Sequence, residues 1–322
     1  MTSNERVRKV IKGESVDRTP IYGWVSSNLN DEISAAFGSV AAFEDKYEFD
    51  TAHLFGGPNS LNFEAYKKIQ GSGEELTPDI LLDIPFLPPD HMDDYKGIVD
   101  GIKHHKQDRS RFCYAQTPGF FEQFNSAFGI ENHLCYLSMY SDEIKELYKR
   151  QAEWNKTFAE NCLDLGVDMV HVSDDWGSQN SLLFSPKMWW EFIYPNMKTV
   201  SDAVKAKNGF ISLHSDGCIA SVLDGIVALG FDMLHPWQES AGMSYDLYLN
   251  QYKDRFGILG GLCIQTTLGF GDYKHLENEI RRVFQLLKGK RWIFCTTHFV
   301  QNHCSIEELT FAYNLAYKLA RE

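Results

Sequence analysis

The sequence predicts an α/β fold, a (β/α)8 TIM barrel formed by all 322 residues as one domain. Short apolar runs near residues 20, 52, 113, 170, 211, 233, 258 and 294 alternate with helical patterns and make up eight strand–helix units. Polar side chains follow nearly every run, as expected where parallel strands deliver residues to the functional end of a barrel. An open doubly wound sheet would need a glycine-rich phosphate-binding turn after an early strand, and the sequence shows none.

The first third of the chain is the least regular. Residues 3–13 predict a helix that Ser3 or Asn4 could cap, and a turn then leads into a short strand at 21–24. A helix at 31–46 and a strand at 50–55 follow. Residues 59–110 contain four prolines and a mixed charged segment, so we expect an irregular excursion on the barrel rim rather than a second domain.

From residue 111 onward the alternation is regular. The strands are expected at 111–115, 168–172, 209–214, 231–235, 256–259 and 292–295, and the main later helices at 193–207, 219–229, 274–288 and 306–320.

The composition indicates which binding partners and which cellular compartment to expect. Lysine and arginine number 31 against 44 acidic residues, a formal charge of −13, which argues against nucleic acid or an anionic membrane surface as partner. Seven widely spread cysteines indicate reduced thiols rather than a disulfide framework. The N-terminus has no apolar signal core and no apolar run is long enough to span a membrane, so we expect a cytoplasmic protein.

The ends of the predicted strands carry side chains suited to chemistry. These are Tyr22, Trp24, Gln116, Asp174, Asp175, His214, Asp216, Cys218, His235, Gln238, Cys263, Gln265 and His298. Each has a plain structural interpretation: Asp174 and Asp175 could cap helices, Cys263 could be a small buried residue, and His235 a hydrogen-bonded core imidazole. A barrel would bring all of them to one cavity, which favours a functional interpretation of the set.

A metal site is the chemistry that this set favours. His214, Cys263 and His298 would supply imidazole and thiolate ligands from three strands, and three protein ligands with one open position are typical of catalytic zinc. Cys218 and Cys295 are possible substitutes. Bound zinc can polarise a substrate oxygen or sulfur as a Lewis acid.

These motifs resemble the uroporphyrinogen decarboxylase superfamily and, within it, the branch of corrinoid-dependent methyltransferases. The resemblance rests on residues 5–7 (ERV) with 17–20 (DRTP), 174–179 (DDWGSQ), 214–217 (HSDG), 260–261 (GG) with 265–266 (QT), and His298 followed by 306–308 (IEE). It implies a TIM barrel, in agreement with the strand count.

The chain departs from the family pattern in two places. Residues 24–29 (WVSSNL) stand where true decarboxylases carry basic residues for substrate carboxylates, which argues against tetrapyrrole decarboxylation. The methylcobalamin:coenzyme M methyltransferases bind zinc through a His-x-Cys motif and a later cysteine, but here Asp216 and His298 replace the two cysteines. Harder ligands suit an oxygen-bearing substrate such as a methyl ether better than the thiol coenzyme M.

The resemblance therefore implies a zinc-dependent methyltransferase that moves a methyl group between a small methylated compound and a corrinoid. The chain has no corrinoid-binding motif of its own, so the cobalamin would be carried by a partner protein. Asp175 or Asp216 would protonate the leaving group. Strand alternation sends only one of Asp174 and Asp175 into the barrel mouth, and we expect Asp175 to be that one because the adjoining Trp176–Gly177 turn should present it to the pocket. The expected substrate-binding residues are Tyr22, Trp24, Asp174, Trp176, Gln179, His235, Gln238 and Gln265.

Two alternatives stay open at this point. One is a metal-free decarboxylase, a lyase acting on a small carboxylated substrate. The other is a non-catalytic corrinoid-binding or tetrapyrrole-binding scaffold that kept the barrel and lost turnover.

Overall fold

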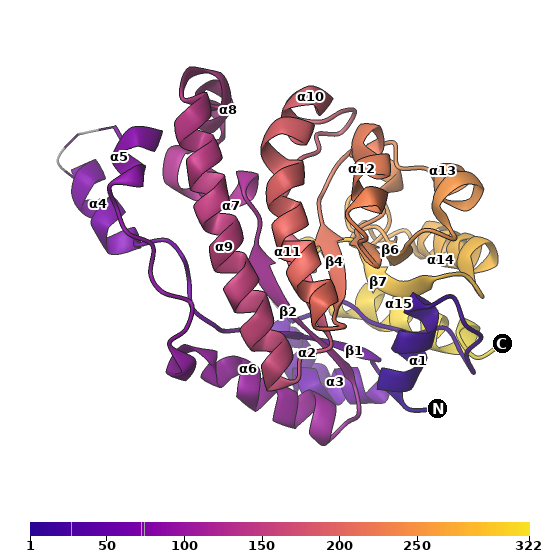
Figure 1. Cartoon of the computed structure of the whole chain (residues 1–322). Helices are drawn as coiled ribbons and strands as arrows, with labels where there is room; N and C mark the ends of the chain where they lie inside the picture. Colours follow the sequence, from indigo (N-terminus) through magenta and orange to yellow (C-terminus); the bar gives the residue numbers. More distant parts are fainter. Residues whose placement is uncertain (27, 72, 74) are drawn as a thin grey trace.

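The computed structural model of the chain describes residues 1–26, 28–71, 73 and 75–322, so Ser27 of the segment 24–29 lies outside the described residues (Figure 1). Its strands form one parallel sheet in sequential order, β1 (Thr51–Leu54), β2 (Phe112–Pro118), β3 (Met169–Ser173), β4 (Phe210–His214), β5 (Met233–His235), β6 (Gly257–Leu262) and β7 (Trp292–Thr296). Parallel strands in chain order with intervening helices make a TIM-barrel-like α/β fold.

The predicted eight strands are only partly confirmed, because the described residues form seven. The predicted first strand is a single parallel bridge between Ile21 and Phe294 of β7. Tyr22 N donates to Phe294 O over 2.8 Å, and Asp50 N, just before β1, donates to Ile21 O over 2.8 Å. The segment therefore lies between the two edge strands. Its ladder stays short because Pro20 has no N–H and Trp24 N donates instead to the Thr296 hydroxyl, 2.9 Å away.

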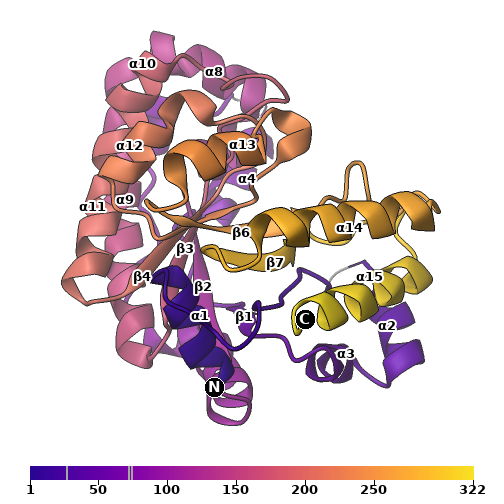
Figure 2. The same ribbon diagram turned by 90° about the vertical axis from the view of Figure 1, so that its right-hand side faces the viewer.

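Helices surround the sheet, with α9 and α11 along one side and α14 and α15 along another (Figure 2). The helices are α1 (Ser3–Ile11), α2 (Asn30–Phe37), α3 (Val40–Lys46), α4 (Phe63–Gly71), α5 (Pro78–Leu82), α6 (Lys96–Gly101), α7 (Phe121–Phe128), α8 (Ile130–Met139), α9 (Ser141–Leu165), α10 (Pro186–Met188), α11 (Tyr194–Ala206), α12 (Leu223–Ala228), α13 (Tyr245–Leu247), α14 (Tyr273–Leu287) and α15 (Ile306–Leu319). Among the described residues, no helix combines the length and the apolar character needed to cross a membrane.

Two helix predictions need correction. The single helix expected at 31–46 is divided into α2 and α3, because Gly38 ends α2 in a left-handed conformation and the Ser39 side chain caps α3. The first helix is capped by Thr2, not by Ser3 or Asn4. The Thr2 side chain accepts from Glu5 N, and the Glu5 carboxylate accepts from Thr2 N in return.

The excursion at 59–110 is divided into two parts. Residues of α6 and the preceding turn, Tyr95 and Ile98, pack with Ala52 and Leu54 of β1, so this part covers the sheet as a barrel helix would. The other part, α4 and α5, lies farther from the strands, and α5 contacts α9 (Figure 1).

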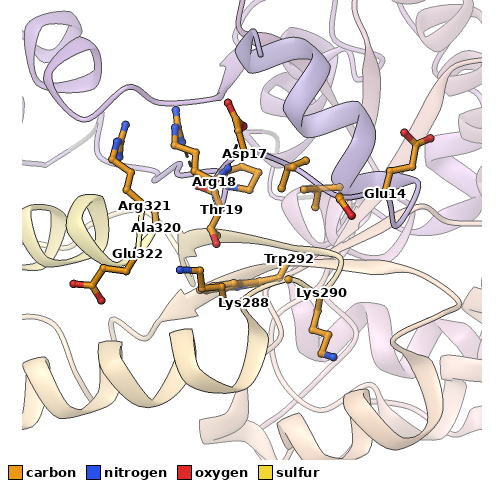
Figure 3. Close-up of a pocket in the computed structure, with 15 residues that line it drawn as sticks. Glu14, Asp17, Arg18, Thr19, Lys288, Lys290, Trp292, Ala320, Arg321 and Glu322 are labelled. Atoms are coloured by element: carbon orange, nitrogen blue, oxygen red, sulfur yellow. Dashed lines mark hydrogen bonds between the residues drawn. The ribbon is translucent and has the colours of Figure 1, made fainter.

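Charged residues close the end of the sheet where the strands begin. Asp50 is fully buried and accepts from Arg6 over 2.6 Å, from Arg18 over 2.7 Å and from Ile21 N over 2.8 Å. Asp17 also accepts from Arg6. A cavity of about 320 Å³ opens at this same end, beside Arg18 and Lys288 (Figure 3). These contacts give the motifs at 5–7 and 17–20 a structural role far from the carboxyl ends of the strands.

Candidate functional site

The site begins where β4 and β5 end side by side. His214 and His235 are the last residues of these strands and are paired in the ladder. Parallel strands direct their carboxyl ends to one edge, so the loops after β3, β4 and β7 meet there. They bring Asp175, Asp216 and His298 to the His214 imidazole.

His214, Asp216 and His298, which we call the metal group, hold one ligand atom each within 4.8 Å of the others. His214 Nε2 lies 3.9 Å from Asp216 Oδ1, and His298 Nε2 lies 4.0 Å from Asp216 Oδ2. These distances are too long for hydrogen bonds, but ligands about 2 Å from a shared tetrahedral ion lie at slightly shorter spacings. Two imidazoles and a carboxylate are a ligand set of catalytic zinc, so the residues fit this metal.

Carboxylates concentrate negative charge beside the metal group. Asp175 Oδ1 lies 3.6 Å from His214 Nε2 and accepts a hydrogen bond from Asp216 N over 2.8 Å. Desolvation raises the pKa of Asp175, and desolvation together with the Asp175 charge raises the pKa of Asp216 to about 7. A cation bound among these groups would stabilise their ionised forms.

The imidazole of His214 is neutral. Burial lowers the pKa of His214 to about 3 and the pKa of His235 well below its ordinary value. Neutral imidazole is the form that binds metals. Together with His171, these two residues form a second set of three clustered histidines, the inner histidine group, which is entirely buried in the barrel.

The structure brings together only part of the predicted ligand set. His214 and His298 lie in the metal group, whereas Cys263 belongs to neither group among the described residues, and Asp216 takes the third place. Cys263 instead lines a neighbouring cavity with Ser240. The two substitutes are also outside both groups. Cys295 is buried with its sulfur 4.0 Å from His235 Nε2, and Cys218 is partly exposed.

A cavity of about 440 Å³ lies at the ends of β1, β2 and β3, and we call it the β1–β3 cavity. Aromatic residues Phe55 and Phe299 line it together with polar Gln116 and Glu122. The Glu122 carboxylate accepts from the Ser173 hydroxyl over 2.9 Å, and desolvation and the Asp175 charge raise the pKa of Glu122 to about 7. Sequence reasoning missed Glu122 as a site residue because it lies in α7 and does not directly follow a strand.

A second cavity, of about 470 Å³, lies at the ends of β4 to β7, and we call it the β4–β7 cavity. Its lining residues are Asp216, Gln238, Ile264, Gln265, Phe270, Thr297, His298, Gln301 and His303. The predicted pair Gln238 and Gln265 is therefore placed at a cavity, and the Gln238 amide donates to Gln265 Oε1 over 2.7 Å. Asp216 and His298 line this cavity, while Phe299, next in sequence, lines the β1–β3 cavity.

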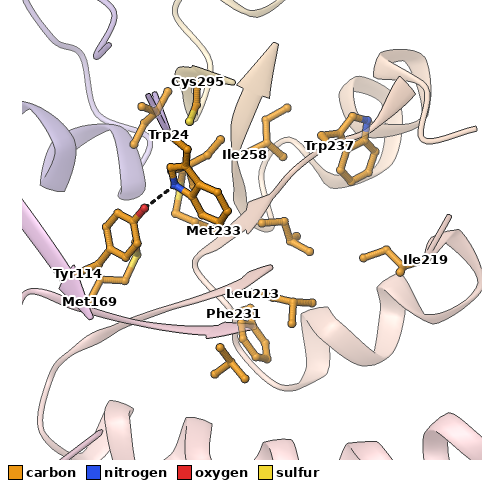
Figure 4. Close-up of a cluster of buried hydrophobic side chains, with 14 of the residues drawn as sticks. Trp24, Tyr114, Met169, Leu213, Ile219, Phe231, Met233, Trp237, Ile258 and Cys295 are labelled. Atoms are coloured by element: carbon orange, nitrogen blue, oxygen red, sulfur yellow. Dashed lines mark hydrogen bonds between the residues drawn. The ribbon is translucent and has the colours of Figure 1, made fainter. Parts of the chain in front are cut away.

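Three predicted aromatic pocket residues are buried instead. Tyr22, Trp24 and Trp176 are each at most 5% exposed. Trp24 lies behind the site, where its indole N–H donates to Tyr114 Oη over 2.7 Å (Figure 4). Its ring stacks on His214 with a centroid separation of 5.1 Å, so Trp24 supports the imidazole from the barrel core.

The other predicted substrate contacts differ in position. Asp174 is fully buried and accepts from Glu122 N over 2.7 Å, so it anchors the start of α7. Gln179 is exposed on the loop after β3. His235 is buried, and both of its ring nitrogens have partners within the protein.

The chain matches one known protein family and is similar in fold to solved structures. The sequence profile of the family described as uroporphyrinogen decarboxylase (URO-D) matches residues 124–319. No curated protein matches the sequence. A solved methyltransferase from Methanosarcina mazei is similar over 99% of both chains, with a TM-score of 0.68 and 13% identity, which shows a shared fold. A B12-independent methionine synthase from Shewanella sp. W3-18-1 is more distant, with a TM-score of 0.47, 12% identity, and coverage of 70% of this chain and 66% of its own.

Proposed function

Because this chain belongs to the uroporphyrinogen decarboxylase family, we propose that it is a zinc-dependent methyltransferase that moves a methyl group between a small methylated compound and the corrinoid of a partner protein. The family match confirms the resemblance that the sequence motifs indicated. The observation that carries the proposal is the metal group, two imidazoles and a carboxylate at the strand ends, reached from the β4–β7 cavity. The solved methyltransferase with the same fold supports it by analogy.

The cavities argue against a carboxylated substrate. The described residues that line the β1–β3 and β4–β7 cavities include no lysine or arginine. Tetrapyrrole carboxylates, or the sulfonate of coenzyme M, would meet Glu122 and Asp216 there without a lysine or arginine to pair with. A neutral or cationic methyl compound, such as a methyl ether, is the substrate class that this lining accepts.

Each residue then has a role set by its position. His214 Nε2, the Asp216 carboxylate and His298 Nε2 would hold the metal, and bound zinc supplies Lewis-acid polarisation of the heteroatom that carries the methyl group. Asp175, whose Oδ1 lies 3.6 Å from His214 Nε2, is placed to deliver a proton to that heteroatom as the methyl leaves. Phe55 and Phe299 wall the β1–β3 cavity, which Glu122 also lines.

The test follows methyl transfer directly. The purified, zinc-loaded protein is mixed anaerobically with cob(I)alamin, free or carried by a corrinoid protein, and with a panel of methyl ethers, methylamines and methyl thiols. We expect at least one compound to convert the cob(I) absorbance to that of methylcobalamin. If no compound does so while a carboxylated substrate releases carbon dioxide, the protein is a lyase.

Metal content tests the ligand set separately. We expect about one zinc per chain in the wild type and its loss in His214→Ala, whereas Cys263→Ser keeps the metal because Cys263 lies outside the metal group. Zinc loss in Cys263→Ser with retention in Asp216→Ala would restore the ligand set predicted from sequence, in which Cys263 stands in place of Asp216.

A further inference from the structure

We propose that His235 is a positioning residue that fixes the tautomer of His214, so that Nε2 of His214 is left free to bind the metal. The inference rests on the proposed function, since it concerns the metal site of that function. The sequence predicts His235 as a substrate-binding residue, whereas the structure places it in the barrel core beside His214.

The argument starts from the Thr296 carbonyl at the end of β7. His235 Nε2 lies 3.0 Å from Thr296 O. A carbonyl oxygen can only accept a hydrogen bond, so His235 Nε2 carries the hydrogen. A neutral imidazole has one N–H, and Nδ1 of His235 is therefore a bare acceptor.

The tautomer of His235 in turn fixes the tautomer of His214. The two Nδ1 atoms of His214 and His235 lie 2.8 Å apart, a hydrogen-bond distance, so one of them must donate. Because His235 Nδ1 is bare, His214 Nδ1 is the donor, and His214 Nε2 is left with its lone pair. This lone pair lies 3.6 Å from Asp175 Oδ1 and 3.9 Å from Asp216 Oδ1. A lone pair that faces two carboxyl groups at these distances leaves room for a cation between them, and that position belongs to the metal group.

Packing holds the His235 ring in the orientation that makes these two hydrogen bonds. It is 1% exposed, and its ring stacks on His214 at 5.0 Å and lies 4.3 Å from the Trp24 ring. Ladder pairing of β4 with β5 holds the two imidazoles side by side. An imidazolium buried without a paired anion is costly, so His235 is neutral in this position.

We call the two hydrogen bonds that join Thr296 O to His235 and His235 to His214 the relay. The relay also decides between the two histidine groups. A metal in the inner histidine group would have to take a ring nitrogen of His235, and both of these are already hydrogen-bonded, Nδ1 to His214 and Nε2 to Thr296 O. The buried Nε2 of His171 is open, with no hydrogen-bond partner among the described residues, but it cannot complete that group without His235. The relay therefore places the metal in the metal group and leaves His171 without a part in binding it. A hydrogen bond to the far nitrogen of a ligating histidine is the usual way in which proteins orient such a ligand.

Three variants separate these roles. His235→Asn retains an oxygen acceptor near the position of Nδ1, His235→Phe retains a ring without nitrogens, and His171→Asn changes the other buried imidazole near His214. Zinc affinity is measured by competition with a chromophoric chelator, and thermal unfolding identifies variants that fail to fold. We expect zinc affinity to fall about 10- to 100-fold in His235→Phe and to stay near wild type in His235→Asn and His171→Asn.

The tautomers themselves are measured without metal. Long-range ¹H–¹⁵N spectra of the zinc-free wild type at pH 7 should show His214 protonated on Nδ1 and His235 protonated on Nε2. His214 protonated on Nε2, equal zinc affinity in His235→Phe and wild type, or loss of zinc in His171→Asn to the same extent as in His235→Phe would overturn the relay. If the wild type binds no zinc, the proposed function fails, but the spectra still decide the relay.

Discussion

At the scale of single residues, strand geometry divides two adjacent carboxylates. Asp174 and Asp175 follow β3 directly, and neighbouring side chains of an extended segment point to opposite sides. Asp174 turns inward to Glu122 N, whereas Asp175 lies at His214 and Asp216. The assignment of Asp175 to the barrel mouth stays a prediction for catalysis, and the geometry supports it.

We expect Asp175→Asn to lower turnover about 10²- to 10⁴-fold with little change in stability, because a general acid is lost. Asp174→Ala should instead lower the free energy of unfolding by about 1–3 kcal/mol, because Glu122 N loses its buried partner. Turnover is measured at equal zinc content and stability by urea unfolding. The reverse pattern would assign the proton transfer to Asp174.

At the scale of elements, the loops after β3 and β4 touch backbone to backbone. A Cβ added at Gly177 would lie 2.5 Å from Asp216 O, and one at Gly217 would lie 2.5 Å from Gly177 C. Gly217 also has a φ of +79°. The glycines of the motifs at 174–179 and 214–217 thus let two loops meet and hold Asp175 beside Asp216.

Gly177→Ala should therefore separate these loops, lower the free energy of unfolding by about 1–3 kcal/mol and weaken zinc binding. Gly71→Ala, at the end of α4, is the matched control, since a Cβ there meets no atom within 4 Å. Calorimetry and zinc titration of both variants check this. Wild-type zinc affinity in Gly177→Ala would show that loop contact does not position the metal group.

A buried histidine joins α7, α8 and α9 and makes their packing sensitive to acid. His133 is fully buried, lies 2.8 Å from Asn125 Oδ1 and accepts from the Tyr148 hydroxyl over 2.9 Å. Burial lowers the pKa of His133 to about 3. The unfolded chain takes up a proton near its ordinary pKa of about 6.5, so the stabilisation present above that pH declines as the pH falls toward 3.

From pH 7 to pH 5 this residue should lower the free energy of unfolding by about 2 kcal/mol. His133→Phe removes the titrating group. We expect the variant to be less stable at pH 7, because Asn125 and Tyr148 lose a partner, and to show a smaller decline toward pH 5. Urea unfolding at both pH values gives the decline in the free energy of unfolding for the wild type and the variant. An equal decline in the two would contradict the assignment to His133.

At the scale of the whole molecule, a buried charge helps to close the sheet. Asp50 connects Arg6 of α1, Arg18 and Ile21 N, and so joins the bridge segment to β1. The segment between β7 and β1 is otherwise held by a few backbone hydrogen bonds and by hydrogen bonds to the side chains of Thr296, Tyr114 and Tyr313. The two ends of the barrel therefore serve different purposes, stability where the strands begin and chemistry where they end.

We expect Asp50→Asn to lower the free energy of unfolding by about 2–4 kcal/mol, because two buried guanidinium groups lose the buried anion that they share and keep only the partly exposed Asp17 and Glu48. Zinc binding in the folded fraction should be unchanged, since the metal group is at the opposite end. The control is Asp202→Asn, whose carboxylate pairs with Lys198 on the surface of α11; this substitution should cost less than about 1 kcal/mol. Equal stability of Asp50→Asn and wild type would show that the Asp50 charge does not contribute to closure of the barrel.

Much of the fold could be predicted because buried parallel strands have a clear signature. Apolar runs that end in polar residues located seven strands to within a few residues, and the strand ends identified His214, Asp216 and His298 as site candidates. The bridge at Ile21 was overestimated as a strand, because an apolar run does not reveal how many ladder hydrogen bonds form. The division of the helix at 31–46 was indicated by Gly38 and Ser39 but was not predicted.

Residue types and their order along the chain by themselves determined the α/β alternation, the family motifs and the presence of imidazoles and carboxylates at strand ends. Only the tertiary structure decided which of them meet. Cys263 and His298 both follow strands, yet only His298 comes within reach of His214 and Asp216. His235 and Trp24 lie behind the site, and Glu122 reaches a cavity from a helix. The physical reason is that periodicity reports burial within each element, whereas loop paths and side-chain packing between elements set the distances across a site.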